Sequence, residues 1–225
     1  MHNTQAFLFD MDGTMLNNMN YHLKAWKKIV AEAGSDMNST DIFDQLYGKN
    51  TEILTRILGS ERYSLEELKA MSYKKDEYYR ELYGPHVQLL GGFNTFVDEA
   101  AAEKIPMAVA TGTIRENVNM VLDKLQLREV FGAIVTGSDV KISKPDPETF
   151  LKAAEQLGVL PSDCIVFEDV PEGVEAARRA GMKAVVVLTS HQIDDFTSFD
   201  NIVMKIDDYR LLSVKELLYL AFRDY

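Results

Sequence analysis

Two aspartates directly follow the apolar run at residues 6–9 and could share one catalytic site. They lie in the segment Asp10-Met11-Asp12-Gly13-Thr14. Because side chains alternate along a strand, a spacing of two lets both carboxylates leave the strand end toward the same side. Such a pair favours a bound divalent cation or a raised pKa, so one carboxylate could act as nucleophile and the other as proton carrier. The same pattern also occurs in plain turns, and by itself it supports either interpretation.

Two further segments contain residue types that bind phosphate. Residues 107–110 are followed by Thr111-Gly112-Thr113, which supply hydroxyls and backbone N–H groups at the start of a predicted helix. Lys144 lies in a proline-stiffened turn, which would fix its ammonium group for a phosphate or for the nucleophile's carboxylate. Taken singly, the threonine is more typical of a helix cap and the lysine of a solvated surface.

A fourth apolar run, at residues 164–167, ends in Glu168 and Asp169. Their carboxylates are hard oxygen ligands of the kind that Mg²⁺ prefers, although a helix cap with an acidic neighbour would have the same pattern. Phosphoryl transfer needs a nucleophile, a cation, donors for the phosphate oxygens and an acid for the leaving group. The four segments together supply all of these. Coincidence is the weaker explanation, so we predict a magnesium-dependent phosphoryl-transfer site.

A sheet must position these segments, since apolar runs alternate with helical patterns along most of the chain. Strands are predicted at residues 6–9, 107–110, 133–135, 165–167, 184–188 and 202–204. Core helices are predicted at residues 93–103, 115–125, 147–156, 172–180 and 209–221. Thr113 and Glu116 have the spacing of a capping box before the second of these helices. The alternation indicates an α/β fold with a doubly wound, Rossmann-like parallel sheet, which binds ligands at the carboxyl ends of its strands.

The interval between the first two predicted strands is long and helical in pattern. Helices are predicted there at residues 20–33, 40–46, 50–58 and 65–83. Ser64 and Glu67 have capping-box spacing before the last of them. We therefore predict two domains. Residues 1–15 and 87–225 would form the α/β catalytic core, and residues 16–86 would form an all-helical cap inserted after the first strand.

The bulk composition argues against several classes of protein. Acidic residues outnumber Lys and Arg by 35 to 24, and this disfavours nucleic-acid binding, which needs clustered basic residues. No window approaches the roughly 18 apolar residues of a membrane span, and the N-terminus lacks a secretory pattern. The single cysteine, Cys164, cannot form an internal disulfide and is expected to be buried. We expect a cytoplasmic monomer without nucleic-acid or membrane partners.

The order and approximate separation of four motifs resemble those of the haloacid dehalogenase superfamily. The motifs are Asp10-Met11-Asp12-Gly13-Thr14, Thr111-Gly112-Thr113, Lys144-Pro145 and Glu168-Asp169. The chain looks in particular like the phosphatases and phosphomutases similar to β-phosphoglucomutase, in which a helical cap is inserted after the first strand. The resemblance spans nearly the whole chain. The four motifs are highly specific together, whereas any one alone would be weak.

The resemblance implies a role for each of the acidic residues. Asp10 would attack phosphorus to form an aspartyl-phosphate, while Asp12 would protonate the leaving oxygen and later activate water. The Mg²⁺ site would comprise the Asp10 carboxylate, the Asp12 backbone carbonyl and Asp169. Glu168 would be a further ligand or a neighbour of the ligands.

The same resemblance implies how the phosphate is held and how the substrate is selected. Thr111, the backbone amides of Gly112 and Thr113, and Lys144 would bind the transferring phosphoryl group. The cap would close over the core, exclude water and contact the leaving group. Specificity for a small phosphorylated metabolite should therefore reside between residues 16 and 86.

Three consecutive cap residues, Gly48, Lys49 and Asn50, lie between two predicted helices and resemble the substrate-specificity loop of these enzymes. They are predicted to bind the substrate, with a plain inter-helix turn as the open alternative. His22 lies where related enzymes often carry a histidine, and Trp26 follows one helical turn later. A packing role within the cap is expected for both.

One departure from β-phosphoglucomutase bears on the reaction. That enzyme carries a further arginine just after the glycine of the specificity loop, whereas this chain has Thr51 near that place and Arg56 farther along. A mutase must hold a bisphosphate and reject water, so loss of this clamp favours hydrolysis. We predict Mg²⁺-dependent hydrolysis of a small phosphate monoester, a phosphosugar or related metabolite. The alternatives are a sugar phosphomutase and, outside enzymes, a phospho-acceptor signalling module, which the inserted cap disfavours.

Overall fold

The computed structural model describes residues 4–222 and contains one six-stranded parallel sheet. Its strands are β1 (Ala6–Phe9), β2 (Met107–Ala110), β3 (Ala133–Val135), β4 (Cys164–Glu168), β5 (Lys183–Val187) and β6 (Ile202–Ile206). The strand order β3-β2-β1-β4-β5-β6 places β1 in the middle, hydrogen-bonded to β2 and β4. The order reverses between β1 and β4, and open α/β sheets bind ligands at such a point.

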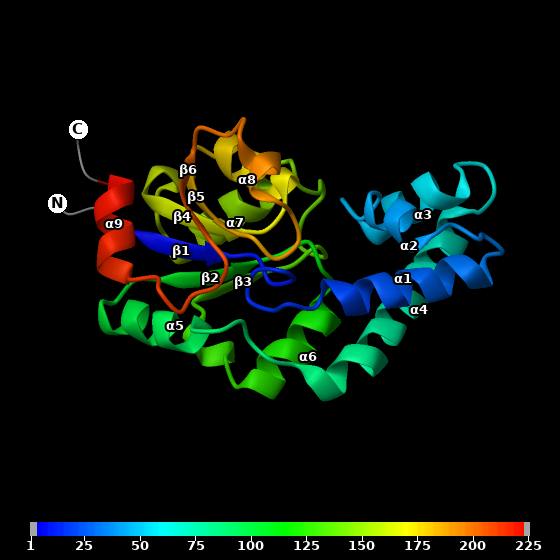
Figure 1. The fold of residues 1–225 in the computed structure, drawn as a ribbon, viewed down its shortest axis with the longest axis horizontal. Coiled ribbons are helices and arrows are strands. Elements are labelled where there is room, and N and C mark those ends of the chain that lie inside the picture. Colours follow the sequence, from blue (N-terminus) through cyan, green and yellow to red (C-terminus); the bar gives the residue numbers. More distant parts are fainter. Residues whose placement is uncertain (1–3, 223–225) are drawn as a thin grey trace.

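Alternate side chains of the strands form two apolar layers, one on each face of the sheet. Phe7 and Phe9 belong to the layer that also contains residues of α5 (Phe93–Ala102), α6 (Arg115–Leu125) and α9 (Val214–Phe222). Ala6 and Leu8 belong to the layer of α7 (Glu148–Leu157) and α8 (Pro171–Arg179). Figure 1 shows α5 and α6 on one side of the sheet and α7 and α8 on the other. Because β1 is covered on both faces, all four of its residues are fully buried.

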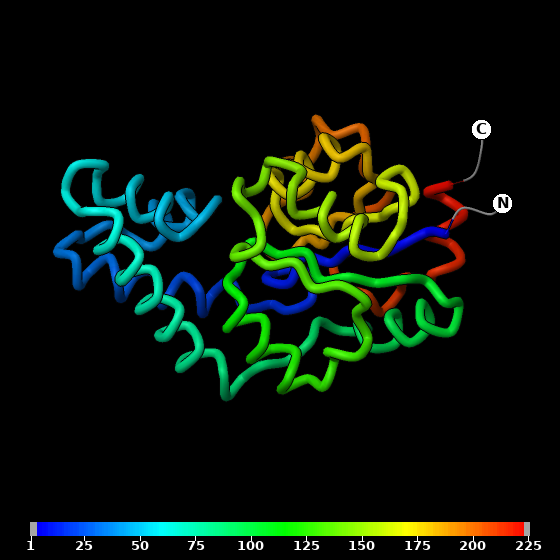
Figure 2. Tube along the Cα trace, turned by 180° about the vertical axis from the view of Figure 1, so that it is seen from behind, coloured from blue at the N-terminus to red at the C-terminus, as the bar shows by residue number. Residues whose placement is uncertain are grey.

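Four helices between β1 and α5 form a separate helical unit. They are α1 (Met19–Glu32), α2 (Ser39–Phe43), α3 (Asn50–Leu58) and α4 (Leu65–Tyr83). They bury an apolar cluster of their own, which includes Trp26, Ile29 and Leu54. The unit lies beyond the carboxyl end of β1, and both termini lie at the opposite end of the molecule (Figures 1 and 2). Short 3₁₀ helices occur at Gly84–His86, Arg128–Val130, Pro161–Asp163 and Ile193–Phe196.

The structure confirms the predicted fold class, with its parallel sheet and the helical cap after the first strand. Most elements begin or end within two residues of their predicted bounds, and α3, α4 and α6 match them. The predicted capping box before α4 is present, since Ser64 accepts from the Glu67 N–H and Glu67 accepts from the Ser64 N–H. Cys164 is buried, as expected. Between residues 4 and 222, no helix combines the length and the apolar character needed to cross a membrane.

Three details of the helix predictions are wrong. The terminal helix starts at Val214 instead of residue 209, because Tyr209 is held by core contacts: its N–H donates to Gly91 and its hydroxyl to the Thr14 carbonyl. The second cap helix ends at Phe43, three residues early. Thr113 does not cap α6, because its hydroxyl accepts a hydrogen bond from Asn117 and the residue at the cap position is Ile114.

Candidate active site

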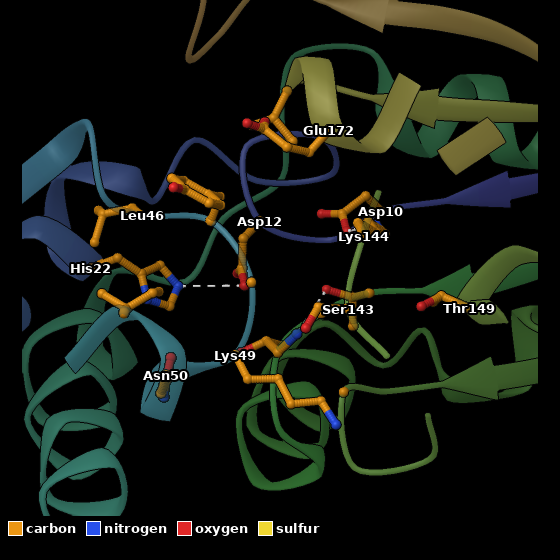
Figure 3. A pocket seen from close by; sticks show the side chains of 18 of the residues that line it. Asp10, Asp12, His22, Leu46, Lys49, Asn50, Ser143, Lys144, Thr149 and Glu172 are labelled. Atoms are coloured by element: carbon orange, nitrogen blue, oxygen red, sulfur yellow. Dashed lines mark hydrogen bonds and ion pairs between the residues drawn. The ribbon is translucent and has the colours of Figure 1, made fainter. Parts of the chain in front are cut away.

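The predicted core motifs meet beyond the carboxyl ends of the strands, around a cavity that the helical unit also lines. Asp10 and Asp12 follow β1, Thr111 follows β2, and Asp169 follows β4. Lys144 reaches the same place from the loop after β3 (Figure 3). All of the residues predicted to act in the core line this cavity: Asp10, Asp12, Thr111, Gly112, Thr113, Lys144, Glu168 and Asp169.

Lys144 uses all three of its N–H donors on the core. Its Nζ lies 2.6 Å from Asp10 Oδ1, 2.6 Å from Glu168 Oε1 and 3.1 Å from the Ala110 carbonyl oxygen. An ammonium group has three donors, so its position is fully determined by these partners. Although burial opposes it, the two carboxylates raise the pKa of Lys144 above its ordinary value. The ammonium group therefore stays charged beside Asp10.

Glu168 is fully buried and is held by several groups at once. Besides the ion pair with Lys144, it accepts hydrogen bonds from the backbone N–H groups of Asp169 and Val170. Its carboxyl group lies against α8 at Gly173, where an added Cβ would come within 1.9 Å of Glu168 Cδ. A residue with a side chain cannot occupy that position without displacing Glu168. The packing favours Glu168 as an anchor for Lys144 over a role as a freely available ligand.

The site holds more negative than positive charge. Asp10, Glu168 and Asp169 are each at most 8% exposed, and Lys144 is the cation that pairs with Asp10 and Glu168. Burial, with Glu168 and Asp12 adding to it, raises the pKa of Asp10 to about 7 in spite of the pairing with Lys144. Burial and the charges of Glu168 and Asp10 also raise the pKa of Asp169 well above its ordinary value. Buried carboxylates at this density favour an added cation.

Asp169 has one carboxyl oxygen that is suited to bind a cation. Its Oδ1 accepts from the Thr14 hydroxyl at 3.2 Å, whereas its Oδ2 is buried without a hydrogen-bond partner. Gly13 has φ of +78°, and a Cβ there would lie 1.9 Å from this Oδ2. The turn after β1 therefore needs glycine both for its left-handed backbone and to leave room beside Asp169.

These observations fit Mg²⁺. Among residues 4–222, no three His, Cys, Asp or Glu side chains form a metal-binding group. Mg²⁺ commonly takes only one or two carboxylates and fills its other positions with water and phosphate oxygens. The carboxylates of Asp10 and Asp169, with the backbone near Asp12, match that smaller requirement. A site with three protein side chains is therefore not needed.

Asp12 lies in different surroundings from Asp10, because its side chain faces the helical unit. Its Oδ1 accepts from Asn18 Nδ2 at 2.6 Å, and its Oδ2 lies 3.4 Å from His22 Nε2 (Figure 3). Asn18 is fully buried and is held in turn by Tyr79 and by the N–H of Gly13. Although burial opposes it, His22 and Asn18 lower the pKa of Asp12. Two carboxylates that are two residues apart thus differ in both partners and proton affinity.

His22 does more than the packing role expected from the sequence. Its Nδ1 lies 3.0 Å from the ammonium group of Lys75, which can only donate. The Nδ1 must therefore accept, and the proton of the neutral ring lies on Nε2, toward Asp12. Burial and Lys75 lower the pKa of His22, which agrees with a neutral ring. Trp26 packs in the apolar cluster of the cap, as expected, and also lines the cavity.

Sequence reasoning missed three polar residues beside the predicted site. All three are at most 2% exposed: Asn18 contacts Asp12, Lys75 contacts His22, and Asp76 contacts Lys75. Asn18 and Lys75 stand in amphipathic or turn segments where a polar residue is ordinary. The Lys-Lys-Asp run in α4 could have drawn attention to Lys75 only if the buried face of that helix had been identified.

The segment after β2 has the features of a phosphate-binding loop. Thr111 is 2% exposed and its N–H donates to the Val135 carbonyl on the neighbouring strand. The Thr113 N–H lies 3.4 Å from the Thr111 hydroxyl oxygen, and α6 starts two residues later. Backbone N–H groups at the start of a helix have no partners within the helix, which makes them suitable donors to phosphate oxygens.

The predicted specificity residues Gly48, Lys49 and Asn50 all line the cavity from the cap side. The Lys49 ammonium group donates to the carbonyls of Val140 and Lys141 in the core, both at 2.9 Å. Asn50 Nδ2 donates to Asp76 at 2.8 Å. Both polar side chains are therefore engaged with the protein, and Lys49 ties the cap to the core. Their predicted contact with substrate stays a prediction.

Arg56 does not replace the arginine clamp of β-phosphoglucomutase. Its guanidinium group donates to the carbonyls of Gln45 and Tyr47 and lies 3.7 Å from the centroid of the Tyr47 ring. These contacts stabilise the loop from outside the cavity. Thr51 is likewise absent from the residues that line the cavity around Asp10. The departure noted in the sequence thus persists in the folded chain.

Comparison with known proteins agrees with this geometry. Residues 7–187 match the family described as haloacid dehalogenase-like hydrolase. The fructose-1-phosphate phosphatase YqaB of Escherichia coli is 35% identical over 184 residues, which cover 81% of this chain and 95% of that protein. A chloroplastic 5-amino-6-(5-phospho-D-ribitylamino)uracil phosphatase of Arabidopsis thaliana is 28% identical over 93% of this chain. The chain spans 57% of that relative's length.

Solved structures give the same result. The structure of a β-phosphoglucomutase from Clostridium difficile superposes with a TM-score of 0.85 at 27% sequence identity, and the match covers 97% of each chain. The relatives are thus named as phosphatases and as a phosphomutase, which confirms the predicted class of enzyme. On the match of residues 7–187 and the identity with YqaB, this chain belongs to the haloacid dehalogenase-like hydrolase family.

Proposed function

We propose that this chain hydrolyses a small phosphate monoester through an aspartyl-phosphate on Asp10. The observation that carries the proposal is the contrast between the two aspartates. Asp10 lies against Lys144 among the buried core carboxylates, where a cation and a phosphate would be bound. Asp12 faces the cap, where a leaving group would lie, and is held by Asn18 beside His22. The first position suits a nucleophile and the second suits a proton carrier.

In the first step, Asp10 would attack phosphorus with a carboxylate oxygen. A bond forms between this oxygen and phosphorus while the ester bond between phosphorus and the leaving oxygen breaks. Asp12 would take up a proton as the negatively charged ester binds beside it, since a nearby negative charge opposes its ionised form. It would then give this proton to the leaving oxygen, so that the leaving group departs as an alcohol. The Thr111 hydroxyl and the N–H groups after it would hold the non-bridging oxygens, and the positive charge of Lys144 beside Asp10 would offset part of their charge.

In the second step, water would attack phosphorus, Asp12 would take its proton, and the bond between phosphorus and Asp10 would break. Inorganic phosphate leaves and both carboxyl groups return to their starting states. When bound, Mg²⁺ would offset the negative charge of the phosphate. The carboxylates of Asp10 and Asp169 and the backbone carbonyl of Asp12 would hold it. Glu168 would position Lys144, since its oxygens already accept hydrogen bonds there.

A phosphosugar or similar polar metabolite is the substrate class that the cavity favours. Its cap side combines the ring of Trp26 with polar groups of His22, Asn50 and Lys75. An aromatic face with hydrogen-bonding groups around it suits a molecule that has both C–H and hydroxyl surfaces. The names of the relatives support this class, since YqaB is named as a fructose-1-phosphate phosphatase.

Hydrolysis is favoured over mutase chemistry because of the position of Arg56. A mutase must bind a bisphosphate, and Arg56 lies on loop carbonyls outside the cavity. The resemblance to β-phosphoglucomutase structures keeps a phosphomutase as the second candidate. The two reactions differ in where the phosphoryl group goes.

The test uses the purified chain with Mg²⁺ and a panel of phosphorylated sugars, fructose 1-phosphate and glucose 1-phosphate among them, in ¹⁸O-labelled water. Hydrolysis puts one ¹⁸O atom into the released phosphate and frees the sugar. A mutase would instead return an isomeric sugar phosphate without ¹⁸O. Near-normal turnover by an Asp10→Asn variant would refute the proposed nucleophile.

A further inference from the structure

An ion pair is buried inside the cap, beside the cavity. Lys75 and Asp76 are neighbours on α4, their side chains are 3% and 2% exposed, and Nζ lies 3.0 Å from Asp76 Oδ1. Removing two charges from water is costly unless each finds further partners. The second partner of Lys75 is His22. The other partners of Asp76 come from two different segments of the chain.

The first of these partners lies in the core. Asn117 of α6 is fully buried, and its Nδ2 lies 3.1 Å from Asp76 Oδ1 and 3.2 Å from the Thr113 hydroxyl oxygen. Its Oδ1 accepts from Arg80 Nη1 at 2.9 Å. Donors and acceptors on all sides fix the orientation of this amide. One side chain of the core thus joins the cap helix α4 to the predicted phosphate loop.

The second partner lies at the predicted specificity loop. Asn50 begins α3, and its Nδ2 donates to Asp76 Oδ2 at 2.8 Å. Both oxygens of Asp76 are therefore engaged, one with Lys75 and Asn117 and the other with Asn50. Asp76 lies at the point where the phosphate loop, the specificity loop and the His22 side of the site are connected.

We infer that Asp76 and Asn117 are positioning residues that align the closed cap with the phosphate loop. This inference rests on the proposed function, because it assigns the alignment to phosphate ester turnover. Neither residue lines the cavity around Asp10, but four residues that they contact directly or through Lys75 do line it. These are His22, Asn50, Lys75 and Thr113.

The hydrogen bond between Asp76 and Asn117 depends on the position of the cap relative to the core. It joins side chains 41 residues apart on two helices, α4 of the cap and α6 of the core. A rotation of the cap that separates the helices breaks this bond and the one from Arg80 to Asn117 together. Closure of the cap restores both hydrogen bonds. Asn50 and Lys75 are then aligned again with respect to Thr113. Small misplacements of this kind have large effects on rate.

A reciprocal exchange of the two residues tests the inference. Asn117→Asp places two carboxylates together, and Asp76→Asn removes the negative charge that pairs with Lys75. The double variant Asp76→Asn with Asn117→Asp exchanges donor and acceptor, so the bond can form again in the opposite direction. The matched control is Asn119→Asp, which makes the same change on α6 where Asn119 accepts from Arg128.

The readout is kcat/KM for two probes, fructose 1-phosphate and acetyl phosphate. Acetate is small and leaves without protonation, so its release does not need an aligned cap. For fructose 1-phosphate, each single variant should lose about 10- to 100-fold, and the double variant should regain most of that loss. For acetyl phosphate, and for Asn119→Asp with either probe, the change should stay below about threefold. The inference would be overturned if a single variant lost equal kcat/KM on both probes, or if the losses of the two single variants multiplied in the double variant. It would also be overturned if Asn119→Asp lowered kcat/KM as much as Asn117→Asp does.

A second measurement does not depend on activity. Spin labels at Glu66→Cys in the cap and Lys124→Cys in the core lie on exposed positions, while the native Cys164 is buried. With Mg²⁺ and orthovanadate, Asn117→Asp should lengthen or broaden the distance distribution between the labels, and the double variant should narrow it again. An unchanged distribution in Asn117→Asp would overturn the inference. Failure of the proposed function would instead appear as acetyl phosphate turnover that Asp10→Asn leaves intact.

Discussion

Two buried clusters of charge, one in the core and one in the cap, are balanced differently. In the core, Asp10 and Glu168 pair with the ammonium group of Lys144, and Asp169 adds a third buried carboxyl group. In the cap, Asp76 is matched by Lys75 and by amide donors. The core cluster has more buried carboxyl groups than ammonium groups, while in the cap cluster the carboxylate of Asp76 is paired with the ammonium group of Lys75. A cluster with unsatisfied charge is suited to bind and react, and a satisfied one is suited to hold other groups in place.

The largest effect should come from the nucleophile of the core cluster. Asp10→Asn keeps the shape of the side chain but removes the attacking carboxylate, so kcat should fall by about 10⁴-fold or more. Phosphate release from fructose 1-phosphate measures the loss, and Asp98→Asn on an exposed part of α5 is the control. Activity within about tenfold of the wild type would show that the core cluster is not the reacting centre.

The next largest effect should separate the two aspartates. Asp12→Asn removes the proton carrier, and kcat with a sugar phosphate should fall by about 10³-fold. Acetyl phosphate should still phosphorylate Asp10, because acetate needs no proton, and the aspartyl-phosphate should then accumulate. Acid-quenched ³²P labelling measures this intermediate. If no labelled protein is trapped while turnover is lost, Asp12 does not have the proposed role.

Asp169→Asn should cause a smaller loss of activity. It should not lower the stability of the protein when Mg²⁺ is absent. Activity should fall by about 10²-fold, as is common when one electrostatic group of a site is removed. In EDTA this variant should melt no lower than the wild type, since one of the repelling carboxylates is neutral. Adding Mg²⁺ at about 100 times its Kd should stabilise the wild type by about 2.7 kcal/mol, and the variant should gain much less. Calorimetric melting curves measure the stability in EDTA and the stabilisation by Mg²⁺. If Mg²⁺ stabilised the wild type and the variant equally, Asp169 would be excluded as a ligand.

The smallest effect should arise in the cap. Lys49→Met removes the hydrogen bonds to Val140 and Lys141, and kcat/KM for fructose 1-phosphate should fall by about fivefold. Lys49→Arg should recover part of this loss, because it can donate to the same carbonyls. The ratio of kcat/KM for fructose 1-phosphate to that for acetyl phosphate is the measurement. A loss of 10³-fold or more would mean that Lys49 acts on the reacting phosphate and does not only tie the cap to the core.

The core of the site could be predicted because it follows from local pattern and sheet topology. Apolar runs such as residues 6–9 and 164–167 are parallel strands, and parallel strands place the residues after their carboxyl ends along one edge. Asp10, Lys144 and Asp169 could therefore be assigned to one site before any contact was known. The errors occurred where tertiary contacts decide the outcome, as at Tyr209, whose bonds to Gly91 and Thr14 delay the last helix.

The amino-acid sequence by itself determined which family this chain belongs to, which fold it adopts and which residues gather beyond the strands. Only the tertiary structure decided that Asp12 faces His22, that Arg56 lies outside the cavity and that Asp76 meets Asn117. The physical reason is that strand periodicity and parallel pairing fix positions within the sheet from local sequence. The contacts between cap and core depend instead on how separate helices pack, and that packing is set by side chains far apart in the chain.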